Sequence, residues 1–174
     1  GWQWYQREQA SQAAGVYGQL DRAIATRDLD KVGAYAEMLT SKYGSTAYAS
    51  MAALQAAKAQ AEAGQPDRAR ELLRWVIDQS SQGELKAIAQ VRLAGVLLDE
   101  KKYDEALKHT AAFLKAFPEH RLAPDVQYVS AECHLQRGEH PQAEKLYAKL
   151  AESATDHPDR GRRGCPGDTP GFPG

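Results

Sequence analysis

The chain has 174 residues, with 22 basic and 23 acidic side chains, a net charge of −1 and 43% hydrophobic residues. The balanced charge argues against a nucleic-acid-binding face, and the hydrophobic content is too high for a disordered chain. Alanine is abundant, at 30 residues, whereas aromatic residues make up only 8%. This composition disfavours a β-sandwich and favours closely packed helices.

Aromatic residues cluster at the start of the chain, where Trp2, Trp4 and Tyr5 precede a charged, helix-forming run. Such residues are typical of the membrane–water interface at the end of a membrane span. No run of 18 apolar residues occurs, so no span is predicted within the chain. We therefore interpret residues 1–12 as a membrane-exit lead-in helix with these three aromatic residues nearest the membrane. The alternative is a helix end that packs on the first repeat.

A repeat with a period of 37 residues follows, over residues 13–157. Small or apolar residues recur at this spacing in three registers: Val32, Ala69, Ala106 and Ala143; Leu39, Val76, Phe113 and Leu150; Leu20, Ala57, Ala94 and Ala131. A fixed period in this range is typical of a solenoid, in which each unit buries its apolar face against its neighbours. The predicted fold is therefore all-α, an α-solenoid of about four helix-turn-helix repeats.

Each repeat is expected to contain two helices. First helices are predicted at 3–26, 50–63, 87–100 and 124–137, and second helices at 30–43, 67–80, 104–117 and 141–154. Gly64 and Gly138 are expected to end first helices. Asp30, Asp67 and Asp104 are expected to cap second helices, because a carboxylate accepts the free N–H groups there.

The composition changes at Pro158. Nine of the 17 residues in 158–174 are glycine or proline. A segment of this kind can neither hold a helix nor bury a core, so the sequence predicts a disordered tail.

Catalytic and metal-binding motifs are absent from the sequence. The five histidines lack metal-ligand spacing, and two cysteines cannot complete a four-ligand zinc site. Cys133 and His134 are neighbours on a predicted helix, so their side chains diverge by about 100°. We interpret them as a buried thiol beside a helix-face histidine, against the alternative of a Cys–His nucleophile. The sequence thus predicts a non-enzymatic protein with no metal and no cofactor.

The repeats resemble the tetratricopeptide repeat (TPR), whose pattern of alanine, aromatic residue and proline is matched in the third unit by Ala106, Phe113 and Pro118. The resemblance implies a peptide-binding groove along the first helices. Its predicted residues are Tyr17, Asp21, Leu54, Lys58, Val91, Leu98, Tyr128 and Glu132. A clamp for a terminal carboxylate is not expected, because two of these residues are acidic. Alternatively, a neighbouring helix or a second copy of the chain covers several of the apolar ones.

The N-terminal aromatic residues, the alanine-rich stretch 45–63 and the stretch 85–94 together resemble the YfgM family. The resemblance implies a TPR-like domain on the periplasmic side of the bacterial inner membrane, anchored upstream of Gly1. Implied partners are subunits of the SecYEG translocon, periplasmic chaperones and unfolded polypeptides. The alternative function is a periplasmic or outer-membrane-linked TPR scaffold in envelope assembly or cell division. A homo-oligomer is compatible with both.

Overall fold

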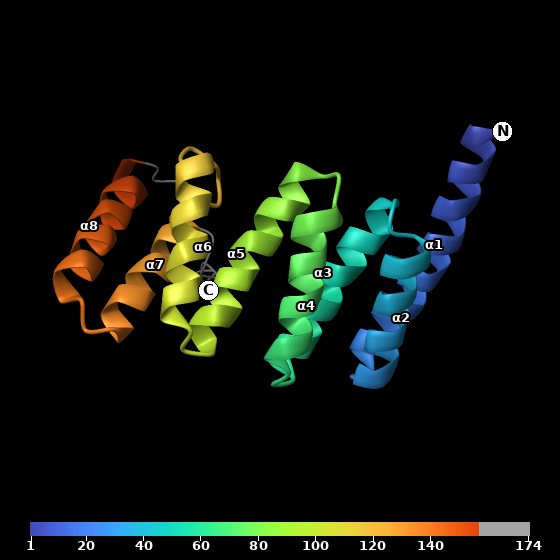
Figure 1. Cartoon of the computed structure of the whole chain (residues 1–174), viewed down its shortest axis with the longest axis horizontal. Coiled ribbons are helices and arrows are strands. Elements are labelled where there is room, and N and C mark those ends of the chain that lie inside the picture. Colours follow the sequence, from blue (N-terminus) through green and yellow to red (C-terminus); the bar gives the residue numbers. More distant parts are fainter. Residues whose placement is uncertain (157–174) are drawn as a thin grey trace, which may run out of the picture.

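The computed structural model describes residues 1–156, and these residues form eight helices and no strand (Figure 1). The helices are α1 (Trp2–Ala25), α2 (Leu29–Lys42), α3 (Ala47–Glu62), α4 (Pro66–Gln79), α5 (Gly83–Asp99), α6 (Tyr103–Ala116), α7 (Ala123–Gln136) and α8 (His140–Asp156). The predicted all-α fold with two helices per repeat is confirmed. The largest boundary differences are at α3 and α5, which begin at Ala47 and Gly83 rather than at 50 and 87. The predicted tail at 158–174 lies outside the described residues, as does the end of the predicted repeat domain.

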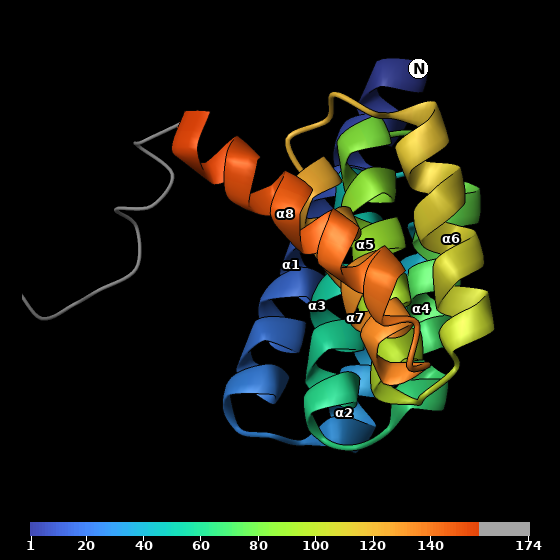
Figure 2. The same cartoon turned by 90° about the vertical axis from the view of Figure 1, so that its left-hand side faces the viewer.

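The helices form two layers, one made of the first helices of the repeats and the other of the second helices (Figures 1 and 2). Each helix packs against the next one in sequence, and the first helices α1, α3, α5 and α7 also contact one another. Within the described part of the chain, the second helices α2, α4 and α6 make no such contacts among themselves. The first-helix layer is therefore closely packed, whereas the second-helix layer is open between neighbouring helices.

Burial follows the predicted repeat. Eleven of the twelve residues in its three registers are buried. Seven of them are 0% exposed: Leu20, Val32, Leu39, Ala69, Val76, Ala106 and Ala131. The exception is Leu150, which is half-buried in α8. Small residues explain the close approach of the first helices, since α3 buries five alanines. We infer that alanine is abundant in this chain because it occupies helix–helix contacts, where a larger side chain would overpack the interface.

The turn after each first helix has the same backbone conformation in all four repeats. One residue of each turn has a positive φ: Arg27 (56°), Gly64 (79°), Lys101 (62°) and Gly138 (78°), spaced at the repeat period. The following residue donates its N–H to the carbonyl five residues earlier, as Lys102 does to Leu97 at 2.9 Å. This bond closes a Schellman motif. The two glycines end first helices as predicted, and the other two repeats place long side chains in the same strained conformation.

Replacing Lys101 by glycine is expected to raise the free energy of unfolding by about 0.5–1 kcal/mol. The left-handed conformation costs a residue with a Cβ about 1–2 kcal/mol, partly offset by the greater freedom of glycine in the unfolded chain. Conversely, Gly64→Ala should lower the free energy of unfolding by about 1 kcal/mol. A Cβ at Gly64 would touch nothing within 4 Å, so this loss would come from backbone strain and not from a steric clash. Urea denaturation followed by circular dichroism measures both changes. A Lys101→Gly variant that is less stable than the parent chain would contradict this expectation.

The predicted aspartate caps are wrong. Asp30, Asp67 and Asp104 lie inside the first turns of α2, α4 and α6, because each helix begins one residue earlier than expected. The side chain that caps α2 is Asp28, which accepts a hydrogen bond from the N–H of Lys31 at 3.3 Å. The three aspartates still favour their helices, since a carboxylate in the first turn interacts favourably with the helix dipole.

Candidate protein-binding surfaces

Tyr17 contributes an ordered aromatic group to the first-helix layer. Its ring lies 5.7 Å from the ring of Tyr48 on α3, centre to centre, in a tilted arrangement. Its hydroxyl accepts a hydrogen bond from Nε2 of Gln55 at 3.4 Å. Both contacts link α1 to α3, so the half-buried Tyr17 ring has a defined orientation. Asp21 and Lys58, which belong to the same two helices, are exposed.

The aliphatic residues of the predicted groove are less accessible than the sequence indicated. Leu54 is only 6% exposed and belongs to the central core cluster, which is formed by buried residues of α3, α4, α5, α6 and α7. Its predicted role as a groove contact is therefore not compatible with its position. Leu98 is half-buried against the same cluster, and Val91 is half-buried against the smaller cluster of Ala87, Phe113 and Val126. Leu54 is thus covered by neighbouring helices, as the alternative interpretation of the groove predicted.

The C-terminal end of this surface combines Tyr128, Glu132 and Tyr147. The Tyr147 hydroxyl donates a hydrogen bond to the Glu132 carboxylate, and the Tyr128 ring meets the Tyr147 ring edge-on at 6.3 Å. Burial, together with the hydrogen bond to Glu132, raises the pKa of Tyr147 to about 12, so this hydroxyl stays protonated at neutral pH. Tyr128 remains 52% exposed. Sequence reasoning identified Tyr128 and Glu132 but missed Tyr147, because it lies on a second helix.

We define the first-helix face as the predicted groove residues that remain at least partly exposed. They are Tyr17, Asp21, Lys58, Val91, Leu98, Tyr128 and Glu132. The face presents tyrosine rings and charges of both signs around two half-buried aliphatic side chains. It therefore combines polar and apolar groups, and it suits a partner that offers hydrogen bonds as well as apolar side chains.

The N-terminal end of α1 carries Tyr5 and the two most exposed aromatic residues of the described chain, Trp2 and Trp4. Trp2 is 72% exposed, Trp4 69% and Tyr5 52%. Trp2 and Tyr5 also line a cavity of about 340 Å³ whose other wall is the 45–48 segment before and at the start of α3. Figure 1 shows this end of α1 extending beyond α2. None of the described helices is long and apolar enough to span a bilayer.

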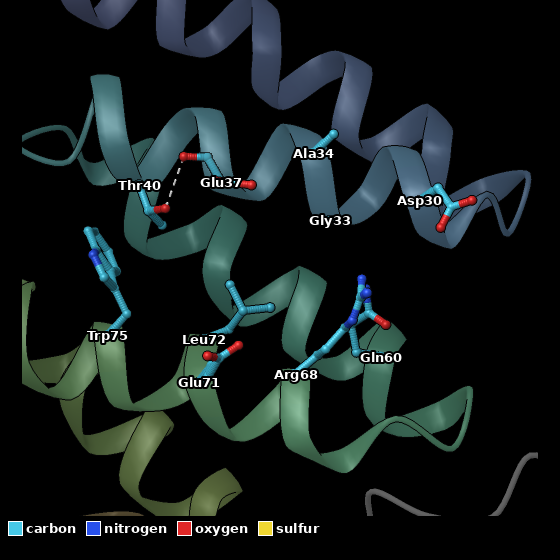
Figure 3. Close-up of a pocket in the computed structure, with 10 residues that line it drawn as sticks. All are labelled: Asp30, Gly33, Ala34, Glu37, Thr40, Gln60, Arg68, Glu71, Leu72 and Trp75. Carbon is cyan, nitrogen blue, oxygen red and sulfur yellow. Dashed lines mark hydrogen bonds between the residues drawn. The ribbon is translucent and has the colours of Figure 1, made fainter.

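A larger pocket lies in the second-helix layer between α2 and α4 (Figure 3). Its volume is about 770 Å³. We call it the α2–α4 pocket, and its lining residues include Asp30, Gly33, Glu37, Gln60, Arg68, Glu71, Leu72 and Trp75. Sequence reasoning missed it. The available signal was a pair of residues that break the repeat, Gly33 and Gln60.

Cys133 and His134 do not form a catalytic pair. Cys133 is fully buried in the core, and burial raises the pKa of its thiol to about 11. His134 instead places its Nδ1 3.3 Å from Oε2 of Glu139. Within residues 1–156, no group of three or more histidine, cysteine, aspartate or glutamate side chains is arranged to hold a metal ion. Neither observation offers a site for nucleophilic or metal chemistry.

We expect Cys133 to react with a thiol reagent only when the protein unfolds. A buried thiol with a raised pKa carries almost no thiolate at neutral pH. The test uses a Cys165→Ser variant, so that Cys133 is the single cysteine, and follows labelling with a chromogenic disulfide reagent. Labelling should be slow in buffer and fast in denaturant. Rapid labelling of the folded protein would restore the nucleophile hypothesis.

Comparison with known proteins identifies the repeat family. Residues 1–158 match the family described as tetratricopeptide repeat-like domain. This chain belongs to that family. The TPR-like chain is also 30% identical over 152 residues to a Neisseria gonorrhoeae protein named ancillary SecYEG translocon subunit. The aligned region covers 85% of this chain and 71% of the Neisseria protein. These matches confirm both the TPR and the YfgM-like resemblance.

Proposed function

We propose that this TPR-like chain is a non-enzymatic interaction module that acts at the Sec translocon on the periplasmic side of the bacterial inner membrane. The observation that carries the proposal is the 30% identity to the ancillary SecYEG translocon subunit of Neisseria gonorrhoeae across most of both chains. Two observations support a role without catalysis. The Cys133 thiol is buried with a raised pKa, and the described residues contain no cluster that could hold a metal ion.

The first-helix face is the proposed binding surface. Tyrosine rings combine apolar area with a hydrogen-bonding hydroxyl and lose little conformational freedom on binding. Tyr17 and Tyr128 lie near opposite ends of the array and are each held by a ring contact. The face therefore suits an extended or helical segment of a translocon subunit, a periplasmic chaperone or an unfolded polypeptide.

Site-specific photocrosslinking in cells tests this surface. A photoreactive amino acid at Tyr128 of the full-length protein should capture translocon or chaperone partners. The matched control places the same group at Lys108, which is exposed on the second-helix layer. Capture from Lys108 with none from Tyr128 would reject the first-helix face.

Membrane attachment is the second part of the proposal. The exposed Trp2, Trp4 and Tyr5 are the residue types that lie at headgroup level when a chain leaves a bilayer. In this proposal an apolar segment upstream of these residues anchors the full-length protein. The protein should then fractionate with inner membranes and resist extraction by carbonate. Recovery as a soluble species would reject the anchor and favour the envelope-scaffold alternative.

A further inference from the structure

The gap between α2 and α4 is kept open by a glycine. The residues one and two repeats after Gly33 are Arg70 and Leu107. Arg70 reaches Glu100 at the end of α5, and Leu107 packs on the central core cluster. Gly33 has no side chain, and the nearest atom to a Cβ built there is Nη1 of Arg68, at 3.5 Å. The first repeat thus leaves space where the next two repeats place a large side chain.

The rim of the α2–α4 pocket has an excess of negative charge. Three carboxylates, those of Asp30, Glu37 and Glu71, line it beside the single cation Arg68. Ion pairs within the described residues involve none of these four side chains. Figure 3 shows Glu37 on α2 and Glu71 on α4, on opposite sides of the space. Like charges facing each other across a gap favour a cation between them.

The base of the pocket is apolar except for one buried amide. Leu72 and Trp75 of α4 supply the apolar part. Both also pack against the central core cluster and against a second core cluster, which is formed by buried residues of α1, α2 and α3. Gln60 is 1% exposed, and its Oε1 has no hydrogen-bond partner among residues 1–156. The equivalent residues of the other repeats are Ala23, Leu97 and His134, so two of these three repeats pack an apolar residue here. A buried acceptor without a partner is costly, and a donor from a bound chain would satisfy it.

We propose that the α2–α4 pocket is a second protein-docking site, which takes a polypeptide segment with a basic side chain next to an apolar one. The carboxylates of Glu37 and Glu71 would bind the cation, Leu72 and Trp75 the apolar side chain, and Gln60 a backbone N–H. The pocket belongs to the second-helix layer, whereas the first-helix face belongs to the other layer. One TPR-like chain can therefore hold two partners at once.

Trp75 provides a direct readout. The chain has three tryptophans, so Trp2→Phe/Trp4→Phe leaves Trp75 as the only indole. The probe is an acetylated, amidated peptide of alternating leucine and lysine, and its control alternates leucine and glutamate. The lysine peptide should change Trp75 fluorescence saturably, and the glutamate peptide should not. Glu37→Gln/Glu71→Gln should weaken binding about tenfold at low salt, and less at high salt.

Two glycine variants locate the binding site. Gly33→Leu should fill the pocket and abolish the fluorescence response. Gly95→Leu places the same side chain on α5 near the first-helix face, where a Cβ meets nothing within 4 Å, and should leave the response unchanged. Circular dichroism checks that both variants fold.

Three results would overturn the second site. The first is no saturable binding, and the second is loss of binding in Gly95→Leu but not in Gly33→Leu. The third is self-association of the parent chain that Gly33→Leu abolishes, which would make a second copy the occupant. None of these results affects the crosslinking test of the first-helix face.

Discussion

Replacing Leu97 by alanine is expected to lower the free energy of unfolding by about 2–5 kcal/mol. Leu97 is fully buried in the central cluster, which draws residues from α3, α4, α5, α6 and α7. The loss combines the transfer free energy of the removed methyl groups with the cost of the cavity that remains. Because each repeat is stabilised by its neighbours, damage at this position weakens the contacts on both sides of α5.

Leu135→Ala is the matched control, because Leu135 is 37% exposed near the end of α7. We expect this variant to lose well under half as much stability as Leu97→Ala. Denaturant titrations followed by circular dichroism measure both variants. The slope of the free energy of unfolding against denaturant concentration is also informative. A lower slope for Leu97→Ala than for the parent chain would show that the two halves of the array unfold separately. Equal losses in the two variants would contradict the central position of Leu97.

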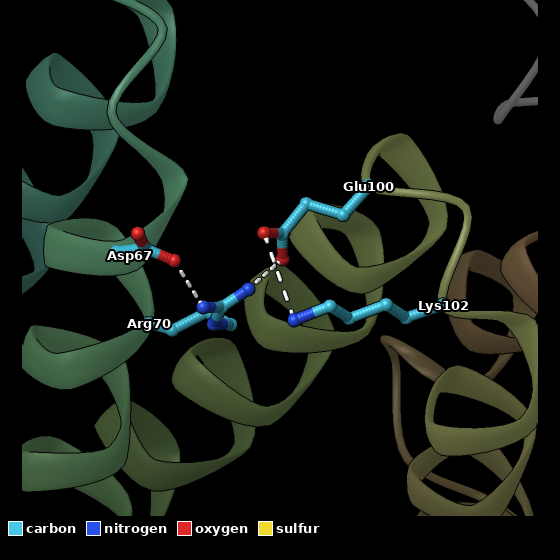
Figure 4. Close-up of polar contacts among 4 residues, drawn as sticks. All are labelled: Asp67, Arg70, Glu100 and Lys102. Carbon is cyan, nitrogen blue, oxygen red and sulfur yellow. Dashed lines mark hydrogen bonds and ion pairs between the residues drawn. The ribbon is translucent and has the colours of Figure 1, made fainter.

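Removing the carboxylate of Glu100 is expected to be the next largest effect. Arg70 donates hydrogen bonds to Glu100 and Asp67, and Nζ of Lys102 lies 3.9 Å from Oε1 of Glu100 (Figure 4). The Arg70 and Glu100 side chains are only 13% and 16% exposed. The hydrogen bond to Glu100 raises the pKa of the Arg70 guanidinium, so its charge is permanent. Glu100→Gln should therefore cost about 1–3 kcal/mol, because a poorly solvated cation loses its counter-charge.

A double-mutant cycle of Arg70→Met and Glu100→Gln isolates the interaction. We expect a coupling of about 1 kcal/mol or more, since the two side chains share one hydrogen-bonded network. Lys31→Gln is the control: its partner is Asp28, and the two side chains are 66% and 40% exposed. Such an exposed pair is worth less than about 1 kcal/mol. A coupling no larger than the effect of this control would show that burial adds nothing to the Arg70–Glu100 pair.

Much of the fold could be predicted because the sequence repeats without gaps. The 37-residue spacing of Val32, Ala69, Ala106 and Ala143 predicted which side chains are buried, and all four are buried. Gly64 predicted a helix end, because few other residues adopt a positive φ without strain. Arg27 and Lys101 adopt the same conformation without any local signal. Their turns follow from the packing of the helices on either side, which overrides the preference of the residue.

The binding surfaces were less predictable than the fold. Position in the repeat placed Leu54 in a groove, but contacts with α4 and α5 bury it in the core. Position also grouped Tyr128 with Glu132, yet the partner of both is Tyr147, which belongs to the next helix. Exposure depends on which side chains meet across helices. A periodic pattern averages over the repeats and does not contain that information.

The sequence by itself therefore determined the helices, the period of the array and most of its core, because these depend on residue types at fixed spacing. Only the tertiary structure decided which positions stay accessible and where the layers separate. The α2–α4 pocket is the clearest case: it depends on the absence of a side chain at Gly33 opposite Gln60 and Arg68. Residues from three helices define that space, and their distances are set by packing between repeats rather than by any local pattern.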